Sequence, residues 1–151
     1  MTPSEVFLRL VHGVAAGDYA SLPALYAEPT DVRHPMAPGG DHPLLTRAAL
    51  REHFGGTGPR VASAISFVPD NVRVHETADP EVIVAEFEYA GTRTADGATF
   101  RVPCIFVLRV RDGLIVESRD YVDHVAMARA RGRLDELFAA AREPRTPAAA
   151  S

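Results

Sequence analysis

Lysine is absent from the sequence, because all 16 basic residues of the 151-residue chain are arginines. Without a lysine amine the protein cannot form a Schiff base with a carbonyl substrate, anchor pyridoxal phosphate or hold a nucleotide with a P-loop lysine. Cysteine is nearly absent as well, since Cys104 has no second cysteine with which to form an internal disulfide. The sequence therefore indicates a cytoplasmic protein.

Long apolar runs and an excess of positive charge are also missing. No apolar run approaches the length of a membrane span, and the first five residues, "MTPSE", lack the basic and apolar regions of a signal peptide. The net charge of -4 and the pI near 5.8 give no electrostatic footprint for nucleic acid. We therefore expect neither a membrane nor a nucleic acid as partner.

What is present is ordinary for a globular protein, with 46% hydrophobic and 24% charged residues. A chain of 151 residues is most simply one domain that can bury a core and a ligand cavity. We place that domain at residues 1–142. The remainder, 143–151 ("EPRTPAAAS"), is expected to be a disordered tail.

Helical patterns dominate the first third of the chain. A capping box at 2–5 starts a helix whose apolar residues recur at helical spacing until Gly17. A second short helix is expected from Asp18, and a third over 47–54, where Gly55 and Gly56 end it. A short extended piece at 31–34 and a loop at 35–45, rich in proline and glycine, lie between them.

Strand patterns follow, and a last helix closes the chain. Asp-Gly pairs at 96–97 and 112–113 predict hairpin turns, and a helix with a possible break at Gly132 is expected over 125–142. The expected strands are 61–68, 71–76, 81–90, 99–111 and 114–123. This order predicts an α+β domain in which helices cover one face of a curved antiparallel sheet. Such a sheet forms a cone, and the open end of the cone is a pocket.

Two long segments resemble a known family. "GDYASLPALYAEPTDVRHPMAPGGDHPLLTRAALREHF" resembles the first half of nuclear transport factor 2-like domains, and "CIFVLRVRDGLIVESRDYVDHVAM" their last hairpin and helix. The similarity is greatest to the SnoaL-like branch, which includes polyketide cyclases, and extends to ketosteroid isomerases and limonene epoxide hydrolases. It spans Val6 to about Leu137 and implies the fold more strongly than the function, because this fold hosts many chemistries.

The resemblance marks individual positions. His34 stands where ketosteroid isomerases carry their general-base aspartate, and Asp120 where the epoxide hydrolases and, approximately, the polyketide cyclases carry a catalytic aspartate. Tyr26 matches a tyrosine that supports the isomerase hydrogen-bond network. Leu10 and Phe106 replace the two oxyanion-binding groups of the isomerases, so that mechanism does not transfer whole.

Strand alternation points independently to Asp120. The more apolar face of the strand at 114–123 consists of Val116, Ser118, Asp120 and Val122. The neighbouring strand is expected to line the same interior with Val102, Cys104, Phe106 and Leu108. Asp120 is therefore the carboxylate expected inside, as a pocket acid or as half of a structural ion pair with an arginine. Asp123, at the strand end, is expected to cap the following helix.

His34 has alternatives of its own. It could simply anchor the turn before Pro35. Together with His42, Asp31 and Asp41 it could be drawn as a metal site, but the spacing matches no recognised motif, so no metal and no cofactor is expected. The residues that we expect to act in catalysis are Asp120 and His34. Substrate contacts are expected from Tyr26, Cys104, Phe106, Ser118 and Val122.

These patterns favour a cofactor-independent enzyme for a hydrophobic small molecule that bears a carbonyl group or an epoxide, such as a polyketide- or steroid-like compound. Asp120 and His34 would exchange a proton with it, as in an isomerase, a cyclase or a hydrolase. The alternatives are a non-catalytic ligand-binding or dimerisation module and a protein-interaction domain. The resemblance and the apolar residues Ile105, Val107 and Tyr121 on the outer side of the sheet predict a homodimer.

Overall fold

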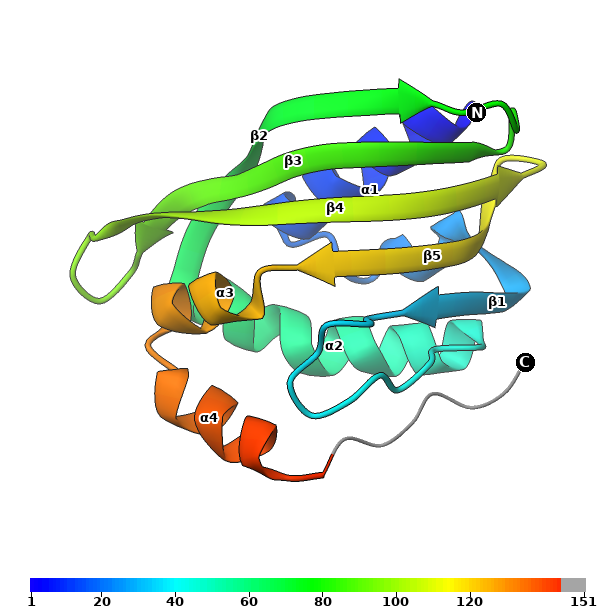
Figure 1. Ribbon diagram of the computed structural model, residues 1–151. Helices are drawn as coiled ribbons and strands as arrows, with labels where there is room; N and C mark the ends of the chain where they lie inside the picture. Colours follow the sequence, from blue (N-terminus) through cyan, green and yellow to red (C-terminus); the bar gives the residue numbers. More distant parts are fainter. Residues whose placement is uncertain (145–151) are drawn as a thin grey trace.

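The computed structural model describes residues 1–144, which form a sheet backed by helices (Figure 1). The expected tail lies outside these residues except for Glu143 and Pro144. The helices are α1 (Pro3–Ala16), a short 3-10 helix (Leu22–Leu25), α2 (Arg47–Ala64), α3 (His124–Arg131) and α4 (Leu134–Arg142). The strands are β1 (Tyr26–Arg33), β2 (Ile65–Glu76), β3 (Val82–Arg93), β4 (Thr99–Arg111) and β5 (Leu114–Val122). None of these helices is both long and apolar enough to cross a membrane.

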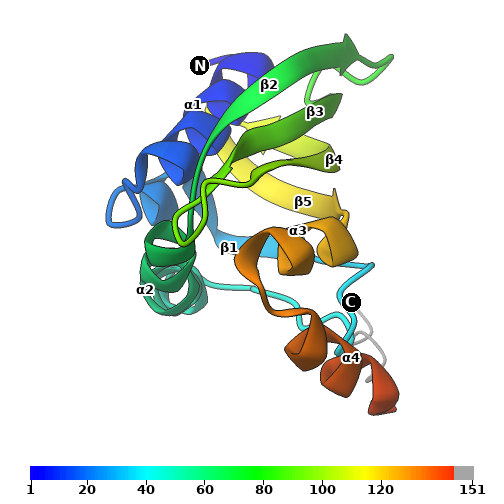
Figure 2. The ribbon, with the colours of Figure 1, turned by 90° about the vertical axis from the view of Figure 1, so that its left-hand side faces the viewer.

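The sheet has the strand order β1-β5-β4-β3-β2. The expected antiparallel pairing holds from β2 to β5, whereas the edge strand β1 runs parallel to β5, with Val32 opposite Ser118. Figure 2 shows the strands bending around α1, with α1 and α2 on the same side of the sheet. The α+β cone predicted from the sequence is therefore confirmed, with one parallel strand added at its edge.

The first helix follows its sequence signal. The Thr2 hydroxyl accepts a hydrogen bond from the Glu5 amide (3.2 Å), and the Glu5 carboxylate accepts one from the Thr2 amide (2.7 Å). Gly17, at φ 75°, ends the helix in the left-handed conformation that glycine tolerates. The apolar stripe on the inner side of α1 is buried and consists of Val6, Phe7, Leu10 and Val11. This stripe forms the floor of the core.

Three expectations about the first half of the chain were wrong at their boundaries. The second helix is only a 3-10 turn, because Tyr26 already belongs to β1, which also includes the extended piece expected at 31–34 except for His34. Helix α2 continues past Gly55 and Gly56 to Ala64. Residues 61–64, expected in a strand, belong to α2, and the rest of the strands expected at 61–68 and 71–76 form one strand, β2, with an irregularity between Asp70 and Arg73.

The extension of α2 has a packing reason. The helix lies so close to Tyr19 that a Cβ atom on Gly58 would stand 2.7 Å from the tyrosine ring. Glycine here permits a close helix contact. Pro59 is accommodated inside the same helix, and Arg60 donates from Nε to the Gly56 carbonyl at 3.1 Å. Gly58 therefore lets α2 pack against Tyr19, whereas Gly55 and Gly56 have no side chain or backbone atom within 4 Å of the position of a Cβ.

The C-terminal half agrees with expectation apart from one bulge. Gly132, at φ 70°, divides the expected helix into α3 and α4, and the Asp123 carboxylate caps α3 by accepting from the Ala126 amide at 2.9 Å. In the β4–β5 pair, Arg109 faces Glu117 but Val110 faces Ile115, so Val116 has no opposite residue. This bulge turns Ile115 into the core and leaves Val116, which was expected inside, only half-buried.

Candidate active site

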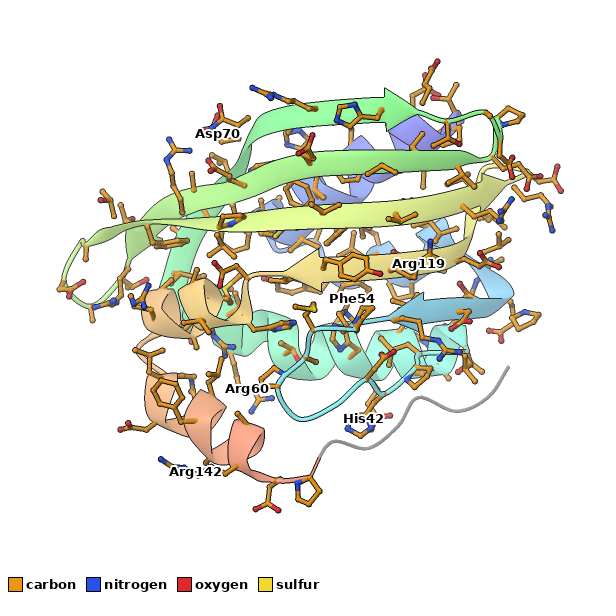
Figure 3. The ribbon with its side chains drawn as sticks, viewed as in Figure 1. His42, Phe54, Arg60, Asp70, Arg119 and Arg142 are labelled. Atoms are coloured by element: carbon orange, nitrogen blue, oxygen red, sulfur yellow. The ribbon has the colours of Figure 1, made fainter. Side chains whose placement is uncertain are left out.

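A cavity of about 140 Å³ lies between the helices and the inner face of the sheet. Most of its wall is apolar and comes from Leu10, Val14, Val32, Leu44, Leu50, Phe54, Phe106 and Val122. The polar residues of the wall are Tyr26, His34, His53, Tyr89 and Asp120. Figure 3 labels Phe54, which lies between α2 and the sheet and marks the position of the cavity. A few polar groups in an apolar pocket are typical of a small-molecule site.

Asp120 reaches the cavity from β5. It lies opposite Phe106 of β4, and only 7% of the residue is exposed to solvent. Ser118, two residues earlier on the same face, donates its hydroxyl to Asp120 Oδ1. Arg119 between them is exposed on the other face, as Figure 3 shows. The strand thus places a carboxyl group inside and keeps the adjacent guanidinium group outside.

His34 reaches the same cavity from the residue after β1. Because β1 runs parallel to β5, with Arg33 beside Arg119, the next residue is carried toward Asp120. The Asp41 carboxylate holds the turn by accepting from the His34 amide at 2.9 Å. His34 Nε2 lies 3.7 Å from Asp120 Oδ2, too far for a direct hydrogen bond but close enough for a shared substrate atom or a small shift.

Burial decides the charge of this pair. Loss of water raises the pKa of Asp120 to about 7, and the hydrogen bond from Ser118 offsets only part of this rise. Burial also lowers the pKa of His34, against the attraction of Asp41. Desolvation is thus the largest cause of both shifts, and it disfavours the charged form of each group. Near neutral pH the Asp120 carboxyl is therefore divided between its protonated and ionised forms, and it faces a His34 ring whose protonation is disfavoured by burial.

His53 also lines the cavity, although a histidine on a helix face is predicted from the sequence alone to lie on the surface. Its ring lies 5.6 Å from the His34 ring, centroid to centroid, at an interplanar angle of 33°. Burial, followed by the nearby charge of His34, lowers the pKa of His53. The spacing of residues on α2 could have predicted that His53 faces inward, because it lies three residues after the buried Leu50 and next to Phe54.

Two phenols complete the polar lining. Tyr26 and Tyr89 are both buried. Burial is the main cause that raises the pKa of Tyr26, and the charge of Asp120 raises it further. The pKa of Tyr89 is raised by burial first, with Cys104 and Asp120 adding to it. Both phenols therefore stay protonated and are possible hydrogen-bond donors. Alternation along β3 could have identified Tyr89, since it shares its face with the buried Phe87.

The other predicted site residues divide into three groups. Tyr26, Phe106 and Val122 line the cavity, and Ser118 contacts Asp120 from behind. Cys104 does not line it; the thiol donates to the Val102 carbonyl at 3.6 Å, and burial raises its pKa to about 12. The two aspartates that could be drawn as metal ligands, Asp31 and Asp41, have other partners. Asp31 pairs with Arg33 at 2.7 Å, and Asp41 holds the His34 amide.

Comparisons with known proteins agree with this architecture. The sequence profile of the SnoaL-like domain matches residues 7–118. A PhzA/B-like protein of Pseudomonas aeruginosa, itself uncharacterized, is 35% identical over 121 residues, which cover 80% of this chain and 84% of that protein. The crystal structure of a candidate isomerase from Bacillus subtilis has a TM-score of 0.73 at 25% identity and covers 86% of this chain and 92% of its own.

A candidate polyketide cyclase from Pseudomonas putida has a TM-score of 0.63 at 22% identity. The match covers 87% of this chain and 98% of that protein, and at this identity it shows the fold alone. The fold is therefore one shared with proteins of the small-molecule isomerase and cyclase type.

Proposed function

Because the chain belongs to the SnoaL-like family, we propose that it is a cofactor-independent enzyme that performs acid/base chemistry on a hydrophobic small molecule with a carbonyl group or an epoxide. The observation that carries the proposal is the approach of His34 Nε2 to Asp120 Oδ2, at 3.7 Å, inside an apolar cavity. A binding module does not need an ionisable pair there, because burying such groups costs free energy.

The two groups suit proton transfer in different ways. A carboxyl group with its pKa raised to about 7 can both donate and accept a proton near neutral pH. The neutral imidazole of His34 offers the complementary acceptor. In an isomerase or cyclase, one group would remove a proton next to the carbonyl and the other would return it. In a hydrolase, the pair would activate water and protonate the epoxide oxygen.

The phenols of Tyr26 and Tyr89 support the same proposal. In the isomerases that the chain resembles, two donors stabilise the oxyanion, but here the corresponding positions are Leu10 and Phe106, both of which line the cavity. A hydrogen bond from either phenol could take over that role, because both remain protonated in the buried site. The oxygen of the substrate would then point toward the tyrosines.

The cavity volume limits how much of the substrate is enclosed. At about 140 Å³ it is smaller than pockets that enclose drug-sized ligands, which hold roughly 300–1,000 Å³. A single ring or a short chain fits, so only the reacting part of a polyketide- or steroid-like molecule would be buried. The remainder would extend beyond the cavity. We include a cytoplasmic location and a homodimer in the proposal, as expected from Cys104 and the outer face of the sheet.

The test uses probes of the size of the cavity. Proton exchange next to the carbonyl of cyclohexanone in D2O and hydrolysis of cyclohexene oxide are followed by NMR with wild type, Asp120→Asn and His34→Ala. We expect Asp120→Asn to lower the rate by roughly 100-fold or more, since general acid/base catalysis contributes about that much. Its melting temperature should not fall, because the carboxyl has no cationic partner to strand.

Asp112→Asn is the matched control, because Asp112 is exposed in the β4–β5 turn at a φ of 53° that asparagine also tolerates. It should keep both rate and stability. Wild-type protein that binds the probes without turnover would favour the non-catalytic ligand-binding alternative. An Asp120→Asn variant that is active but unstable would assign Asp120 a structural role.

A further inference from the structure

Two buried hydroxyl groups lie where β1 meets β5, and they have different partners. Thr30 is 5% exposed, and its hydroxyl donates to a backbone group, the Ile115 carbonyl, at 3.0 Å. Ser118 is 1% exposed, and its hydroxyl donates to Asp120 Oδ1. The first bond joins the two strands, whereas the second ends on the ionisable group of the cavity. Ser118 therefore has a role that the pairing of strands does not explain.

The side chain of Ser118 is flanked by apolar residues. Ser118 lies opposite Val32 of β1 on one side and Leu108 of β4 on the other, and both are buried. Residues two positions apart on a strand share a face, so the Ser118 hydroxyl points to the same side as the Asp120 carboxyl group. Within residues 1–144 this hydroxyl donates to no other group. Breaking the bond would leave a buried donor unsatisfied, which costs free energy.

This hydrogen bond distinguishes the two oxygens of Asp120. Oδ1 accepts from Ser118, whereas Oδ2 lies 3.7 Å from His34 Nε2. If Oδ1 carried the proton, Ser118 would have to accept it, and the hydroxyl proton of Ser118 would have no acceptor among the described residues. The proton of the neutral carboxyl group therefore lies on Oδ2. Proton exchange at Asp120 is confined to the oxygen that faces His34.

We propose that Ser118 is a positioning residue, which holds Asp120 Oδ1 so that Oδ2 gains and loses the proton toward His34 and the cavity. Ser118 itself does not line the cavity, so it would act through Asp120 and not by touching a substrate. Only the transfer of that proton to a substrate rests on the proposed function. The placement of the proton on Oδ2 is a property of the protein without substrate, and it would hold in a non-catalytic binding module as well.

The other titratable groups around Asp120 favour their neutral forms. They come from β1 and the residue after it, α2, β3 and β4, whereas α1 contributes only apolar residues to the cavity. Burial lowers the pKa of the two histidines and raises the pKa of the two phenols and the thiol: His34, His53, Tyr26, Tyr89 and Cys104. The hydrogen bond from Ser118 favours the ionised form of Asp120, and it lowers the pKa against the larger effect of burial.

The experiment follows the Asp120 carboxyl group directly. Aspartate with 13C at its side-chain carboxyl carbon is incorporated and titrated by NMR from pH 4 to pH 10, and Asp120→Asn identifies the resonance by its loss. Ser118→Ala should raise the pKa of Asp120 from about 7 to about 8 or above. The reason is that a hydrogen bond accepted by a charged group is stronger than one accepted by a neutral group, by roughly a factor of ten in the equilibrium constant.

Thr30→Val is the matched control, because it removes the other buried hydroxyl from the same pair of strands and leaves the partner of Asp120 Oδ1 in place. It should lower the melting temperature, as the loss of a buried hydrogen bond does, and keep the pKa of Asp120 near 7. Where a probe is turned over, the limb of the pH–rate profile that reports Asp120 should move to higher pH in Ser118→Ala and stay in place in Thr30→Val.

An unchanged pKa of Asp120 in Ser118→Ala would overturn the inference, because the hydroxyl would then serve packing only. A lowered pKa would overturn it too, since Ser118 would then accept a hydrogen bond from a proton on Oδ1. An equal rise in Thr30→Val would assign the effect to looser packing of β1 against β5. The proposed function fails separately. The titration needs no substrate, so a protein that turns over none of the probes can still show the rise, and an active protein can lack it.

Discussion

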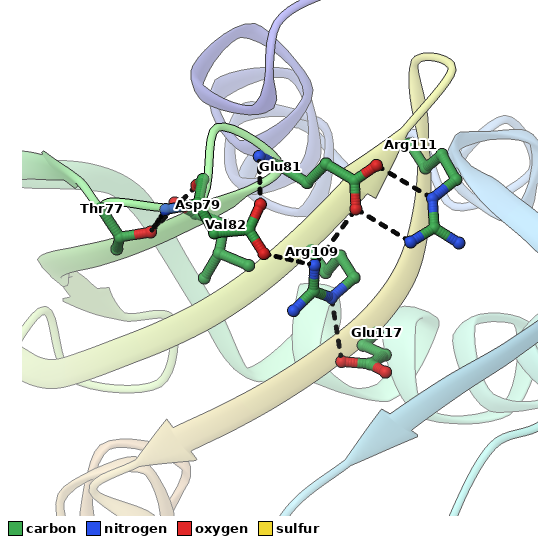
Figure 4. A network of polar contacts seen from close by, with 7 residues as sticks. All are labelled: Thr77, Asp79, Glu81, Val82, Arg109, Arg111 and Glu117. Atoms are coloured by element: carbon green, nitrogen blue, oxygen red, sulfur yellow. Dashed lines mark hydrogen bonds and ion pairs between the residues drawn. The ribbon is translucent and has the colours of Figure 1, made fainter.

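Carboxyl groups have opposite surroundings on the two faces of the sheet. On the outer face, Arg109 contacts Asp79 at 2.7 Å, Glu81 at 3.1 Å and Glu117 at 3.4 Å, a network that Figure 4 shows near the β2–β3 turn. On the inner face, no arginine pairs with Asp120 within residues 1–144. The outer carboxylates are exposed and satisfied by cations, whereas the inner one is buried beside a serine and a neutral histidine.

The consequence is visible in the pKa values. The hydrogen bond from Arg109 lowers the pKa of Asp79, while burial raises the pKa of Asp120 to about 7. Strand alternation makes this separation possible, because Arg119 is adjacent to Asp120 in sequence but lies on the outer face. Burial without a cationic partner thus brings the pKa of this carboxyl group close to neutral pH. Among residues 1–144, no arginine forms the ion pair that was the structural alternative for Asp120.

The largest effect expected from this contrast between the two faces concerns how the free energy of unfolding depends on pH. The pKa of Asp120 is raised from 3.8 to about 7, so the folded state holds a proton that the unfolded state has lost. Stability from this group therefore falls as pH rises from about 4 to 7 and is constant above 7. Asp120→Asn removes the loss. Relative to wild type, it should gain up to about 3 kcal/mol between pH 5 and pH 8.

Urea unfolding at pH 5, 6, 7 and 8 measures this gain. The exposed Asp112→Asn variant should show no such trend. If Asp120→Asn were less stable than wild type at pH 8, Asp120 would be a stabilised carboxylate, and the contrast between the two faces would fail.

An intermediate effect concerns the apolar part of the outer face. Ile105 is 42% exposed and, with Met36 and Tyr121, lines a groove of about 700 Å³ there. If a second copy of the chain covers this face, Ile105→Asp should raise the dimer dissociation constant by roughly 30-fold or more, the effect of losing a central contact. Sedimentation at micromolar concentration measures it.

Leu8→Asp is the control for this experiment, because Leu8 is similarly exposed, at 37%, but lies on α1, on the opposite side of the sheet. It should leave the dimer intact. Wild-type protein that sediments as a monomer at micromolar concentration would contradict the predicted homodimer outright.

The parts of the fold that could be predicted from sequence were those that local chemistry determines. The capping box at Thr2, the turn at Gly113 and the cap at Asp123 each satisfy backbone groups within a few residues. Alternation correctly placed Asp120 inside, because a strand has only two faces. Asp120 and His34 were also expected in one cavity, and they line it together.

The parts that could not be predicted depend on contacts between distant segments. Gly55 and Gly56 were expected to end α2, but the helix continues, and Gly58 lets it approach the ring of Tyr19 from another segment. The parallel pairing of β1 with β5 joins residues more than 80 positions apart, and no local pattern specifies it. His53 seemed a surface residue, because its environment is created only when α2 packs beside the loop that holds His34.

The smallest effect is expected from the outer network itself. Arg109 holds three carboxylates, yet its partners are partly exposed, between 32% and 51%. Exposed ion pairs gain little, because water solvates the separated charges almost as well and salt screens their attraction. Arg109→Gln should therefore lower the melting temperature by less than about 3 °C, although it breaks three contacts. In 1 M NaCl the difference should shrink further, since screening there acts within about 3 Å. Thermal unfolding followed by circular dichroism at low and high salt measures both. A loss of 10 °C or more, unaffected by salt, would mean that the outer charges hold the hairpins together, and the two faces would then differ less than their burial indicates.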